Sequence, residues 1–457
     1  MKRILCLVVI ALTVSAVKAQ KKPNVILILA DDMGWTDLSC YGSKFYESPN
    51  IDKLASSGMK FTNAYSACNV CSPTRASILT GKSPARLHLT DWIPGQKMPF
   101  AKLSPPNWTM YLPLEETTIA ELLKKNGYTT AAIGKWHLGA NEKYAPSKQG
   151  FDFYYEGNNV KVLTDPNAGG KATAELTDAA LKYMESRKDS TFFLYLPYYA
   201  VHAPLQAKQT DIDYFKEKAD LGSKQKNPIY AGMIRELDNH VGRIMAKLKD
   251  LGLEKNTLVI FTSDNGGLIG NEQKNNTITS NLPARAGKGS PYEGGVRIPA
   301  IFSWQGNIAP GSSSSERTIT MDLFNTIANI AAVPAFQSHD GVSLLPVLQG
   351  KQLKAPLHSS LYWHYPHYHA GGSTPYSSIL EGDKRLVYFY ETGKKELYNL
   401  KNDVAEAKDL YPSQRKEGEI LYSKLKLWLE NSNAQYPVPN PDYDEQKKNI
   451  KKARPEN

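Results

Sequence analysis

The stretch that begins at Cys71 holds the most specific arrangement of reactive side chains in this chain. The letters C-S-P-T-R run from Cys71 to Arg75 and continue to Thr80-Gly81, which gives the pattern C-x-P-x-R-x-x-x-x-T-G. Pro73 favours the start of a helix because its ring pre-sets φ. Cys71 would then lie at the positive end of that helix, where unpaired backbone N–H groups favour an anion. The pattern therefore predicts a reactive residue beside a tetrahedral anion.

Cys68 and Cys71 also form a C-x-x-C pair, which is typical of redox dithiols and of half a zinc site. A zinc site needs a second Cys or His pair, and the sequence has none at finger spacing. A thioredoxin-like pair belongs to a much smaller βαβ domain. The third cysteine outside the N-terminal segment is Cys40, and the sequence leaves open whether Cys40 and Cys68 pair.

Oxygen ligands follow two of the expected strands. Asp31 and Asp32 come directly after one apolar run, and Asp264 and Asn265 follow another. Adjacent acids repel one another unless something compensates, and Ca²⁺ or Mg²⁺ prefers such an all-oxygen set. The lack of His ligands in this set argues against a two-zinc phosphatase. The alternative is a pair of ordinary solvated turn acids.

Basic and imidazole side chains follow further strands. Lys135 and His137 stand two residues apart, and they would point to the same side if the segment stays extended. His202 follows a third strand. Lys288 lies between Gly287 and Gly289, where the missing side chains would allow a close approach to a ligand. Each residue alone is more often a surface residue, but together with the carboxylates and Arg75 they indicate one site.

The elements that must position these residues alternate between strands and helices. Apolar runs predict buried strands at 24–30, 129–133, 191–196 and 257–261, and apolar residues at helical spacing predict a helix over 230–248. This alternation predicts an α/β fold with a mostly parallel central sheet flanked by helices. Open α/β sheets bind ligands beyond the carboxyl ends of their strands, so a shared site is expected there.

The pattern changes past residue 350. The helix expected over 320–330 still belongs to the large domain. After residue 350 we expect short strands at 360–364, 377–380, 385–390 and 396–399, followed by a closing helix at 417–429. We therefore expect a catalytic domain over 20–350 and a smaller C-terminal α+β subdomain with an antiparallel sheet over 351–457.

Residues 1–19 have the features of a secretory signal peptide, with a basic start, an apolar centre and the small residues Val17 and Ala19 at the cleavage positions. We expect an exported protein, periplasmic or extracellular, with no membrane span. This segment contributes three positive charges to the formal net charge of +10, so the rest of the chain has a net charge of +7. The basic residues are scattered and no nucleic-acid motif is present, so an acidic polysaccharide is the better-suited partner.

Five motifs in sequence order resemble the type I sulfatases of the alkaline-phosphatase-like superfamily, and the resemblance covers nearly all of the chain. Thr74 stands where Ser or Ala is more usual in that family. The motifs are Asp31-Asp32-Met33-Gly34-Trp35, the Cys71 pattern, Gly134-Lys135-Trp136-His137-Leu138-Gly139, Asp264-Asn265-Gly266 and Glu293-Gly294-Gly295.

The resemblance implies a mechanism. A formylglycine-generating enzyme would oxidise Cys71 to an aldehyde, whose hydrate attacks sulfur. Calcium, with magnesium as the lesser choice, would be bound by Cys71 in this form together with the oxygen set. Arg75 would hold the hydrate. Lys135 and Lys288 would neutralise the charge of the sulfate oxygens. His202 would protonate the sugar oxygen that leaves. His137 would then remove the proton of the remaining hydroxyl at residue 71, which expels sulfate.

The resemblance also implies a sulfated carbohydrate substrate, such as a glycosaminoglycan-like oligosaccharide, with galactose or N-acetylgalactosamine sulfate preferred. Residues that could line its pocket are Arg86, His88, Asp91, Trp92, His364 and His367. Two rival functions stay open: a phosphodiesterase or phosphonate monoester hydrolase of the same superfamily, and an inactive protein that binds sulfated glycans.

Overall fold

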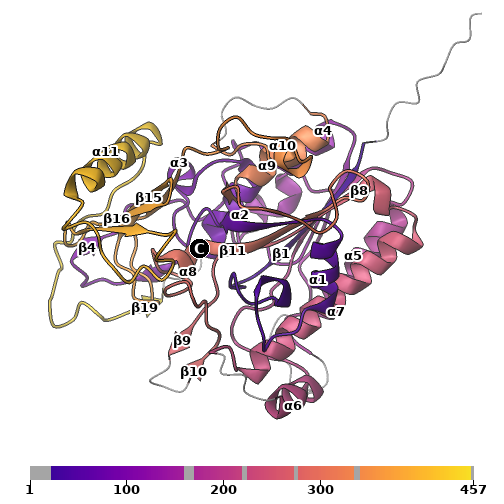
Figure 1. Ribbon diagram of the computed structural model, residues 1–457, viewed down its shortest axis with the longest axis horizontal. Coiled ribbons are helices and arrows are strands. Elements are labelled where there is room, and N and C mark those ends of the chain that lie inside the picture. Colours follow the sequence, from indigo (N-terminus) through magenta and orange to yellow (C-terminus); the bar gives the residue numbers. More distant parts are fainter. Residues whose placement is uncertain (1–21, 159–168, 219–223, 272–275, 334–339, 454–457) are drawn as a thin grey trace, which may run out of the picture.

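A sheet of nine strands forms the centre of the protein in a computed structural model (Figure 1). The structure describes residues 22–158, 169–218, 224–271, 276–333 and 340–453, so the expected signal peptide lies outside the described residues. The strand order is β12-β2-β11-β8-β1-β7-β5-β6, and β13 pairs with β2. The strands are β1 (Asn24–Ala30), β2 (Met59–Tyr65), β5 (Thr129–Ile133), β6 (Phe153–Tyr155), β7 (Phe192–Pro197), β8 (Thr257–Ser263), β11 (Arg297–Ser303), β12 (Ser312–Ser314) and β13 (Thr318–Ile319).

The mostly parallel sheet predicted from the sequence is confirmed. β1 pairs in parallel with β7 and β8, and β5 pairs in parallel with β6 and β7. The sequence reading missed β2 and β11. β11 runs antiparallel to both β8 and β2, so β2 points the same way as β8. The carboxyl ends of β1, β2, β5, β7 and β8 therefore meet at one edge of the sheet.

Side-chain alternation along β1 explains why helices cover both faces of the sheet. Val25, Leu27 and Leu29 enter one apolar cluster, whereas Ile26 and Ile28 enter the other. Helices α2 (Cys71–Thr80), α4 (Ile119–Lys125) and α9 (Asp322–Ile330) pack into the first cluster. The second cluster receives α1 (Pro49–Ser56), α5 (Thr173–Ser186), α6 (Gln209–Glu217) and α7 (Pro228–Asp250).

Helix α7 confirms the helix predicted from the spacing of apolar residues. Its buried residues recur at helical spacing, and Pro228 in the first turn favours the start of the helix. The Asn227 side chain caps it by accepting hydrogen bonds from the N–H groups of Ile229 and Tyr230. The helix extends two residues beyond the predicted range at each end.

The C-terminal part forms a separate antiparallel sheet, as predicted. It consists of β14 (Ser360–Tyr365), β15 (Tyr376–Glu381), β16 (Lys384–Phe389) and β17 (Lys395–Asn399), in that order. Helix α11 (Arg415–Asn431) covers one face, where Leu421, Leu425 and Leu429 pack on the sheet. Trp363 and Tyr365 on the other face pack against the large domain. The exact boundary at residue 350 stays a prediction.

Short elements complete the described chain. The helical turns are Ser39–Tyr41, α3 (Pro84–Leu87), Glu142–Tyr144, Pro146–Lys148, Glu254–Asn256, α8 (Glu293–Val296) and α10 (Leu345–Leu348). The two-residue strands are β3 (Gln96–Lys97), β4 (Leu103–Ser104), β9 (Gly270–Asn271), β10 (Asn276–Thr277), β18 (Val438–Pro439) and β19 (Lys452–Ala453).

A buried ion pair joins the C-terminal sheet to the large domain. Arg385 on β16 is fully buried, and its Nη1 lies 2.8 Å from Glu293 Oε1. Glu406 accepts a hydrogen bond from the backbone N–H of Glu293 at 2.7 Å. Burial raises the pKa of Glu406 to about 8. Glu293 begins the Glu-Gly-Gly motif, so the C-terminal sheet supports a segment that the sequence assigned to the site.

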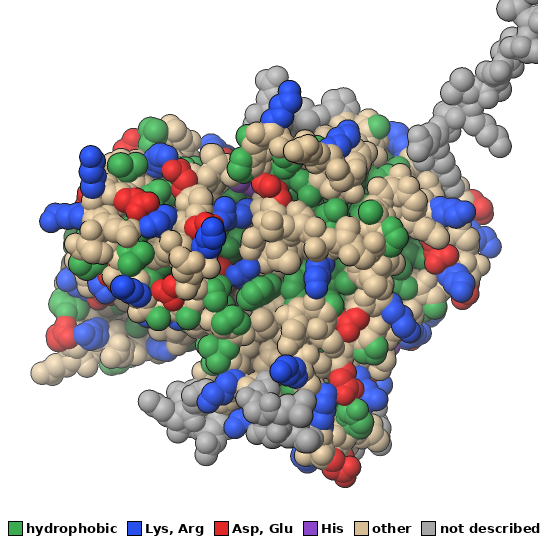
Figure 2. Space-filling model, in the orientation of Figure 1, with side chains coloured by type: hydrophobic (Ala, Val, Ile, Leu, Met, Phe, Trp, Pro, Cys, Tyr) green, Lys and Arg blue, Asp and Glu red, His purple; other side chains and the backbone are tan. Residues whose placement is uncertain are grey.

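Positive and negative side chains are interspersed on the face shown in Figure 2 rather than gathered in one basic patch. Within the described ranges, none of the helices is both long enough and apolar enough to span a membrane.

The pair of His358 and Asp322 generates a prediction about stability. His358 Nε2 lies 2.9 Å from both carboxylate oxygens of Asp322. Burial alone would lower the pKa of His358, but the Asp322 charge raises it above its ordinary value. A raised pKa adds stability that is fully present below the unfolded pKa and is lost as pH rises through the folded pKa. H358Q should therefore lower the free energy of unfolding more at pH 5.5 than at pH 8.5, measured by urea denaturation.

The control is a double-mutant cycle with D322N, in which the pH-dependent part of the H358Q effect should disappear. An H358Q effect that is equal at the two pH values would contradict the assignment.

Candidate active site

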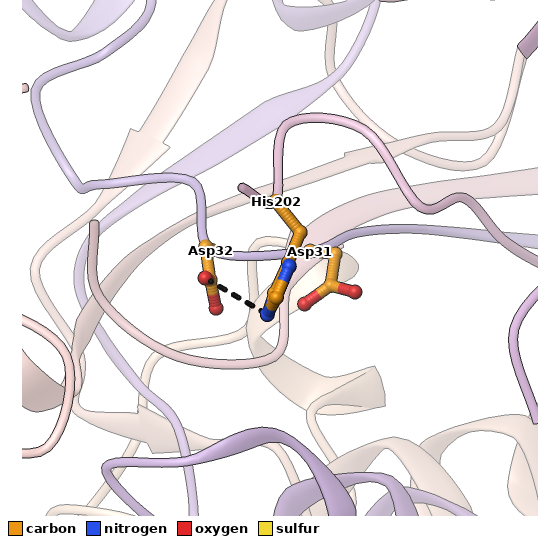
Figure 3. A group of neighbouring side chains, drawn as sticks. All are labelled: Asp31, Asp32 and His202. Atoms are coloured by element: carbon orange, nitrogen blue, oxygen red, sulfur yellow. Dashed lines mark ion pairs between the residues drawn. The ribbon is translucent and has the colours of Figure 1, made fainter. Parts of the chain in front are cut away.

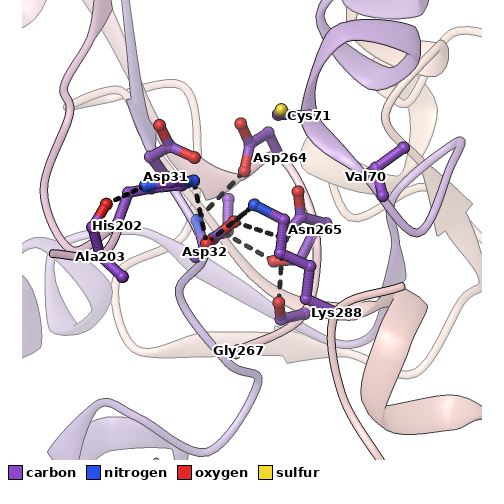
Figure 4. A network of polar contacts seen from close by, with 12 residues as sticks. Asp31, Asp32, Val70, Cys71, His202, Ala203, Asp264, Asn265, Gly267 and Lys288 are labelled. Atoms are coloured by element: carbon purple, nitrogen blue, oxygen red, sulfur yellow. Dashed lines mark hydrogen bonds and ion pairs between the residues drawn. The ribbon is translucent and has the colours of Figure 1, made fainter. Parts of the chain in front are cut away.

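The residues singled out for chemistry come together at the carboxyl edge of the large sheet. Asp31 and Asp32 follow β1, Asp264 and Asn265 follow β8, and His202 follows β7 (Figures 3 and 4). Lys135 and His137 follow β5, Cys71 begins α2, and Lys288 lies in the loop before α8. Because parallel strands end at the same edge, residues up to 257 positions apart become neighbours.

The first two carboxylates are fully buried and lie among cations. Asp31 Oδ2 is 2.6 Å from Lys135 Nζ and 3.5 Å from Arg75 Nη2. Asp32 Oδ1 is 2.7 Å from Lys288 Nζ. Burial alone would raise the pKa of Asp31, but Lys135 and its other cationic neighbours lower it well below its ordinary value. Both carboxylates are thus held in the charged form.

Arg75 organises the third carboxylate. Its Nε and Nη2 donate to Asp264 Oδ2 at 2.9 and 2.7 Å, and its Nη1 donates to the carbonyl oxygen of Lys135 at 2.8 Å. Arg75 itself has no exposed surface. Burial and the charge of Asp31 raise the pKa of Asp264 to about 6 despite this contact. Arg75 therefore locks together the ends of two strands and the helix that begins at Cys71.

Two oxygen atoms in this cluster point to a cation. Asp31 Oδ1 and Asn265 Oδ1 are buried and have no hydrogen-bond partner within the described part of the chain. Buried polar atoms are normally satisfied, so such atoms need a partner that the protein does not supply. Carboxylate and amide oxygens fit a hard divalent cation. The observed geometry is therefore compatible with a metal site formed by Asp31, Asp32, Asp264 and Asn265.

The imidazole of His202 lies next to the carboxylates of Asp31 and Asp32 (Figure 3). Its Nε2 is 3.5 Å from Asp32 Oδ2, and its Nδ1 is 2.5 Å from the carbonyl oxygen of Ala203 (Figures 3 and 4). Ligand atoms of Asp31, Asp32 and His202 lie within 4.8 Å of one another. The unsatisfied oxygen of Asn265 favours the oxygen set over a site that includes this imidazole.

Cys71 Sγ faces His137, and the surroundings assign the imidazole tautomer. His137 Nδ1 lies 3.3 Å from Sγ, and its Nε2 lies 2.5 Å from the carbonyl oxygen of Ile93. A carbonyl only accepts, so Nε2 carries the hydrogen and Nδ1 presents a lone pair toward residue 71. Burial holds the pKa of His137 well below its ordinary value, which keeps the ring neutral. A neutral ring in this orientation can remove a proton from residue 71.

The Lys135–His137 segment does not stay extended, so the condition for placing both side chains by strand alternation is not met. His137 has φ +57° and Gly134 has φ +128°, so the chain turns sharply after β5. The glycine is required because a Cβ there would lie 1.9 Å from the carbonyl oxygen of Pro197. The turn, rather than strand alternation, directs both Lys135 and His137 to the site.

Helix α2 begins at Cys71, as expected, and ends before Gly81. Gly81 adopts φ +69° and caps the helix, with its N–H donating to the carbonyl oxygen of Ser77. Thr74, the departure from the family pattern, accepts a hydrogen bond from the Cys68 N–H at 3.1 Å. Its hydroxyl thereby fixes the approach of the chain to Cys71.

The two alternatives for the C-x-x-C pair gain no support. Cys40, Cys68 and Cys71 are all free thiols. Burial raises the pKa values of the Cys68 and Cys71 thiols, whereas redox-active thiols have lowered values. In the described ranges, the one group of three or more His, Cys, Asp or Glu side chains close enough together to hold a metal is Asp31, Asp32 and His202, and it includes no cysteine.

A cleft of about 860 Å³ opens beside Lys135 and His137. Most of its wall comes from segments that the sequence reading did not connect with the site. The lining includes Trp108, Tyr111, Tyr144, Tyr154, Glu156 and Tyr199. Of these residues, Tyr144 could have been suspected from the sequence because it follows the Lys135 motif closely. Tyr111 and Tyr199 belong to no motif that would have indicated a role in the site.

The six residues expected to line a substrate pocket do not line this cleft. Arg86 forms an ion pair with Asp340 at 2.8 Å, and His88 Nε2 lies 2.7 Å from the carbonyl oxygen of Asn433. Asp91 accepts a hydrogen bond from the Tyr365 hydroxyl at 2.7 Å. Arg86 Nη1 also donates to the carbonyl oxygen of Asn431 at 3.3 Å, so the segment after α2 turns toward the C-terminal part of the chain.

The other three of these residues also contact that region. Trp92 packs against the apolar cluster under β14, His364 Nδ1 lies 2.7 Å from Ser377 Oγ, and His367 Nε2 lies 2.8 Å from Thr90 Oγ1. A role of the six in substrate binding stays a prediction.

The fold and the site together are typical of a class of hydrolases with an α/β fold. In this class, buried carboxylate and amide oxygens, a helix N-terminus and a neutral imidazole surround one reactive residue. Residues 23–333 match the family model described as "Sulfatase". Residues 287–435 match the model described as "N-sulphoglucosamine sulphohydrolase, C-terminal".

Relatives agree with these matches. A "Sulfatase" of Formosa agariphila is 33% identical and covers 95% of each chain. The N-acetylgalactosamine-6-sulfatase of Rattus norvegicus is 36% identical over 78% of this chain and 71% of its own. The crystal structure of Ps i-CgsB in complex with k-i-k-neocarrahexaose superposes with a TM-score of 0.74 at 28% identity, covering 93% of this chain and 95% of that one.

The chain belongs to the type I sulfatase family, and its enzymatic activity is the hydrolysis of sulfate esters.

The position of Arg75 generates a prediction about stability. R75Q would leave buried carboxylates without their cation, so it should lower the free energy of unfolding by about 3 kcal/mol or more. The matched control is R86Q, which removes a partly exposed ion pair and should cost about 1 kcal/mol or less. Urea denaturation of both variants measures the difference, and equal losses would contradict the assigned role of Arg75.

Proposed function

We propose that this protein removes sulfate from a sulfated carbohydrate, using a formylglycine formed from Cys71 and a calcium ion held by Asp31, Asp32, Asp264 and Asn265. The observation that carries the proposal is the pair of unsatisfied buried oxygens beside a residue 71 that faces a neutral imidazole. The similarity to an N-acetylgalactosamine-6-sulfatase supports a galactose or N-acetylgalactosamine sulfate as the substrate.

Each proposed group supplies one kind of chemistry. The hydrated aldehyde at residue 71 would supply one hydroxyl that attacks sulfur and a second one whose deprotonation later expels sulfate. The cation, when bound by these residues, would polarise sulfate oxygens and neutralise their charge. The similarity to the family implies that a formylglycine-generating enzyme acts on the chain, and the segment 1–19 supports export to the periplasm or the outside of the cell.

The residues of this chain then perform the remaining tasks. Lys135 and Lys288 place their ammonium groups at the carboxylate cluster, where they stabilise negative charge on a sulfate bound there. His202 Nδ1 donates to the carbonyl oxygen of Ala203, so Nε2 carries a proton only in the doubly protonated ring, which the nearby Asp32 carboxylate favours. In that form Nε2 protonates the leaving sugar oxygen. His137 Nδ1 accepts the proton of the second hydroxyl at residue 71. The role of Arg75 is to hold Asp264 and the turn at Lys135 in place for these steps.

Metal binding can be tested without measuring activity. Saturating Ca²⁺ should raise the melting temperature of the protein by about 3 °C or more, because the ion binds the folded form alone. D31N and N265A should lose this increase. D213N, which changes an exposed acid away from the site, should keep it. An increase that D31N and N265A retain would contradict the proposed ligands.

The reaction is tested by ion chromatography of sulfate and phosphate released from a panel of sulfated and phosphorylated sugars. The protein used has its Cys71 peptide checked for the aldehyde by mass spectrometry. We expect calcium-dependent sulfate release, and C71A should lower it by about 10³-fold or more because the nucleophile is lost. C40A, which removes a cysteine outside the site, should remain active.

Two outcomes would contradict the proposal. Release of phosphate without sulfate would show the phosphodiesterase or phosphonate monoester hydrolase alternative to be right. Tight binding of sulfated glycans by aldehyde-bearing protein that releases neither ion would show an inactive glycan-binding protein.

A further inference from the structure

The cleft beside the catalytic residues has a preformed aromatic wall. The rings of Tyr111 and Tyr144 stack with centroids 3.9 Å apart and planes 9° apart. Gly139 makes this arrangement possible, because a Cβ there would lie 2.6 Å from Tyr144 Cβ and 3.2 Å from Tyr111 Cβ. The same cleft is lined by Lys135 and His137, so the aromatic pair lies within one cavity with the reacting end of the site.

The outer face of Tyr111 is the one presented to a ligand. The spacing of 3.9 Å leaves no room between the two rings. Lys143 Nζ lies 5.3 Å from the centroid of the Tyr144 ring and therefore covers the outer side of that ring. Tyr111 remains 37% exposed. An exposed aromatic face of this kind packs well against the C–H face of a pyranose ring, because both surfaces are apolar.

The rest of the cleft is acidic. Apart from Lys135, the charged side chains that line it are Glu142 and Glu156, and both are exposed to solvent. Glu156 is held in place by Tyr199, whose hydroxyl donates to Oε1 at 3.0 Å. A second sulfate or a carboxylate placed in this part of the cleft would meet like charge, whereas a neutral sugar would offer hydroxyl groups that donate to the glutamates.

We propose that Tyr111 forms the stacking surface of a subsite for a neutral sugar ring joined to the sulfated sugar, and that Glu142 and Glu156 disfavour a second anionic group there. The proposal rests on the proposed function and defines its substrate class further. The substrate is an oligosaccharide whose reacting sugar carries the sulfate and whose neighbouring sugar is uncharged.

The stacking surface is tested with aldehyde-bearing protein on two substrates: a monosulfated monosaccharide and a disaccharide that adds one neutral sugar to it. Y111A should raise KM for the disaccharide about three- to tenfold with kcat nearly unchanged, because a ring contact of this kind is lost. We expect a monosaccharide to bind at the reacting end without contact to Tyr111, so its KM should stay the same. Y111F is the matched control and should behave as the wild type on both substrates.

The charge selection is tested with a disaccharide that carries a second sulfate on the neighbouring sugar. The wild type should prefer the monosulfated disaccharide, measured as the ratio of the two kcat/KM values. E156Q keeps the acceptor for Tyr199 but removes the charge, so the ratio should fall about fivefold. E142Q should lower the ratio as well, and D213N should leave it unchanged.

An unchanged disaccharide KM in Y111A, or an unchanged ratio in E156Q and E142Q, would overturn this subsite while leaving the proposed sulfatase reaction intact. A failure of aldehyde-bearing wild-type protein to release sulfate from all three substrates would instead overturn the proposed substrate class as a whole.

Discussion

The structure depends on keeping three buried carboxylates charged side by side. Asp31, Asp32 and Asp264 end two neighbouring parallel strands, and burial of such groups is unfavourable unless cations compensate it. Arg75 reaches Asp264 from helix α2, and two lysines reach the other carboxylates from separate loops. This compensation fixes where α2 begins, and it therefore fixes the position of Cys71. The same cluster leaves two oxygens unsatisfied, which suits a bound cation.

The C-terminal sheet contributes to this site without supplying reactive groups. Its Arg385 pairs with Glu293, and the Glu-Gly-Gly motif lies against the strand end that carries Asp264 and Asn265. A Cβ at Gly266 would lie 1.9 Å from the carbonyl oxygen of Gly294, so the two segments pack backbone against backbone. The motif is thus a structural contact that holds a strand end in place.

The reacting end of the site and the cleft beside it come from different parts of the chain. The strand ends and α2 supply the charged cluster, whereas the loops around Tyr111, Tyr144 and Glu156 supply the cleft wall. Loops tolerate change more readily than buried strand ends do. A family can therefore keep one reaction while its members differ in the sugars that they accept, and the loops of this chain are the place to look for its own preference.

The sequence by itself determined the fold class, the main strands and helices, and the members of the charged cluster. Continuous apolar runs and helical spacing are local signals, and polar groups after parallel strands must meet at one edge. The sequence did not determine β2 and β11, the sharp turn at His137, or the wall of the cleft, because these depend on packing between distant segments. Arg86, His88 and Asp91 lie close to α2 in sequence, yet they contact the C-terminal region. Only the tertiary structure decided which side chains near the reactive residue face a ligand, since that depends on which backbone segments can approach one another.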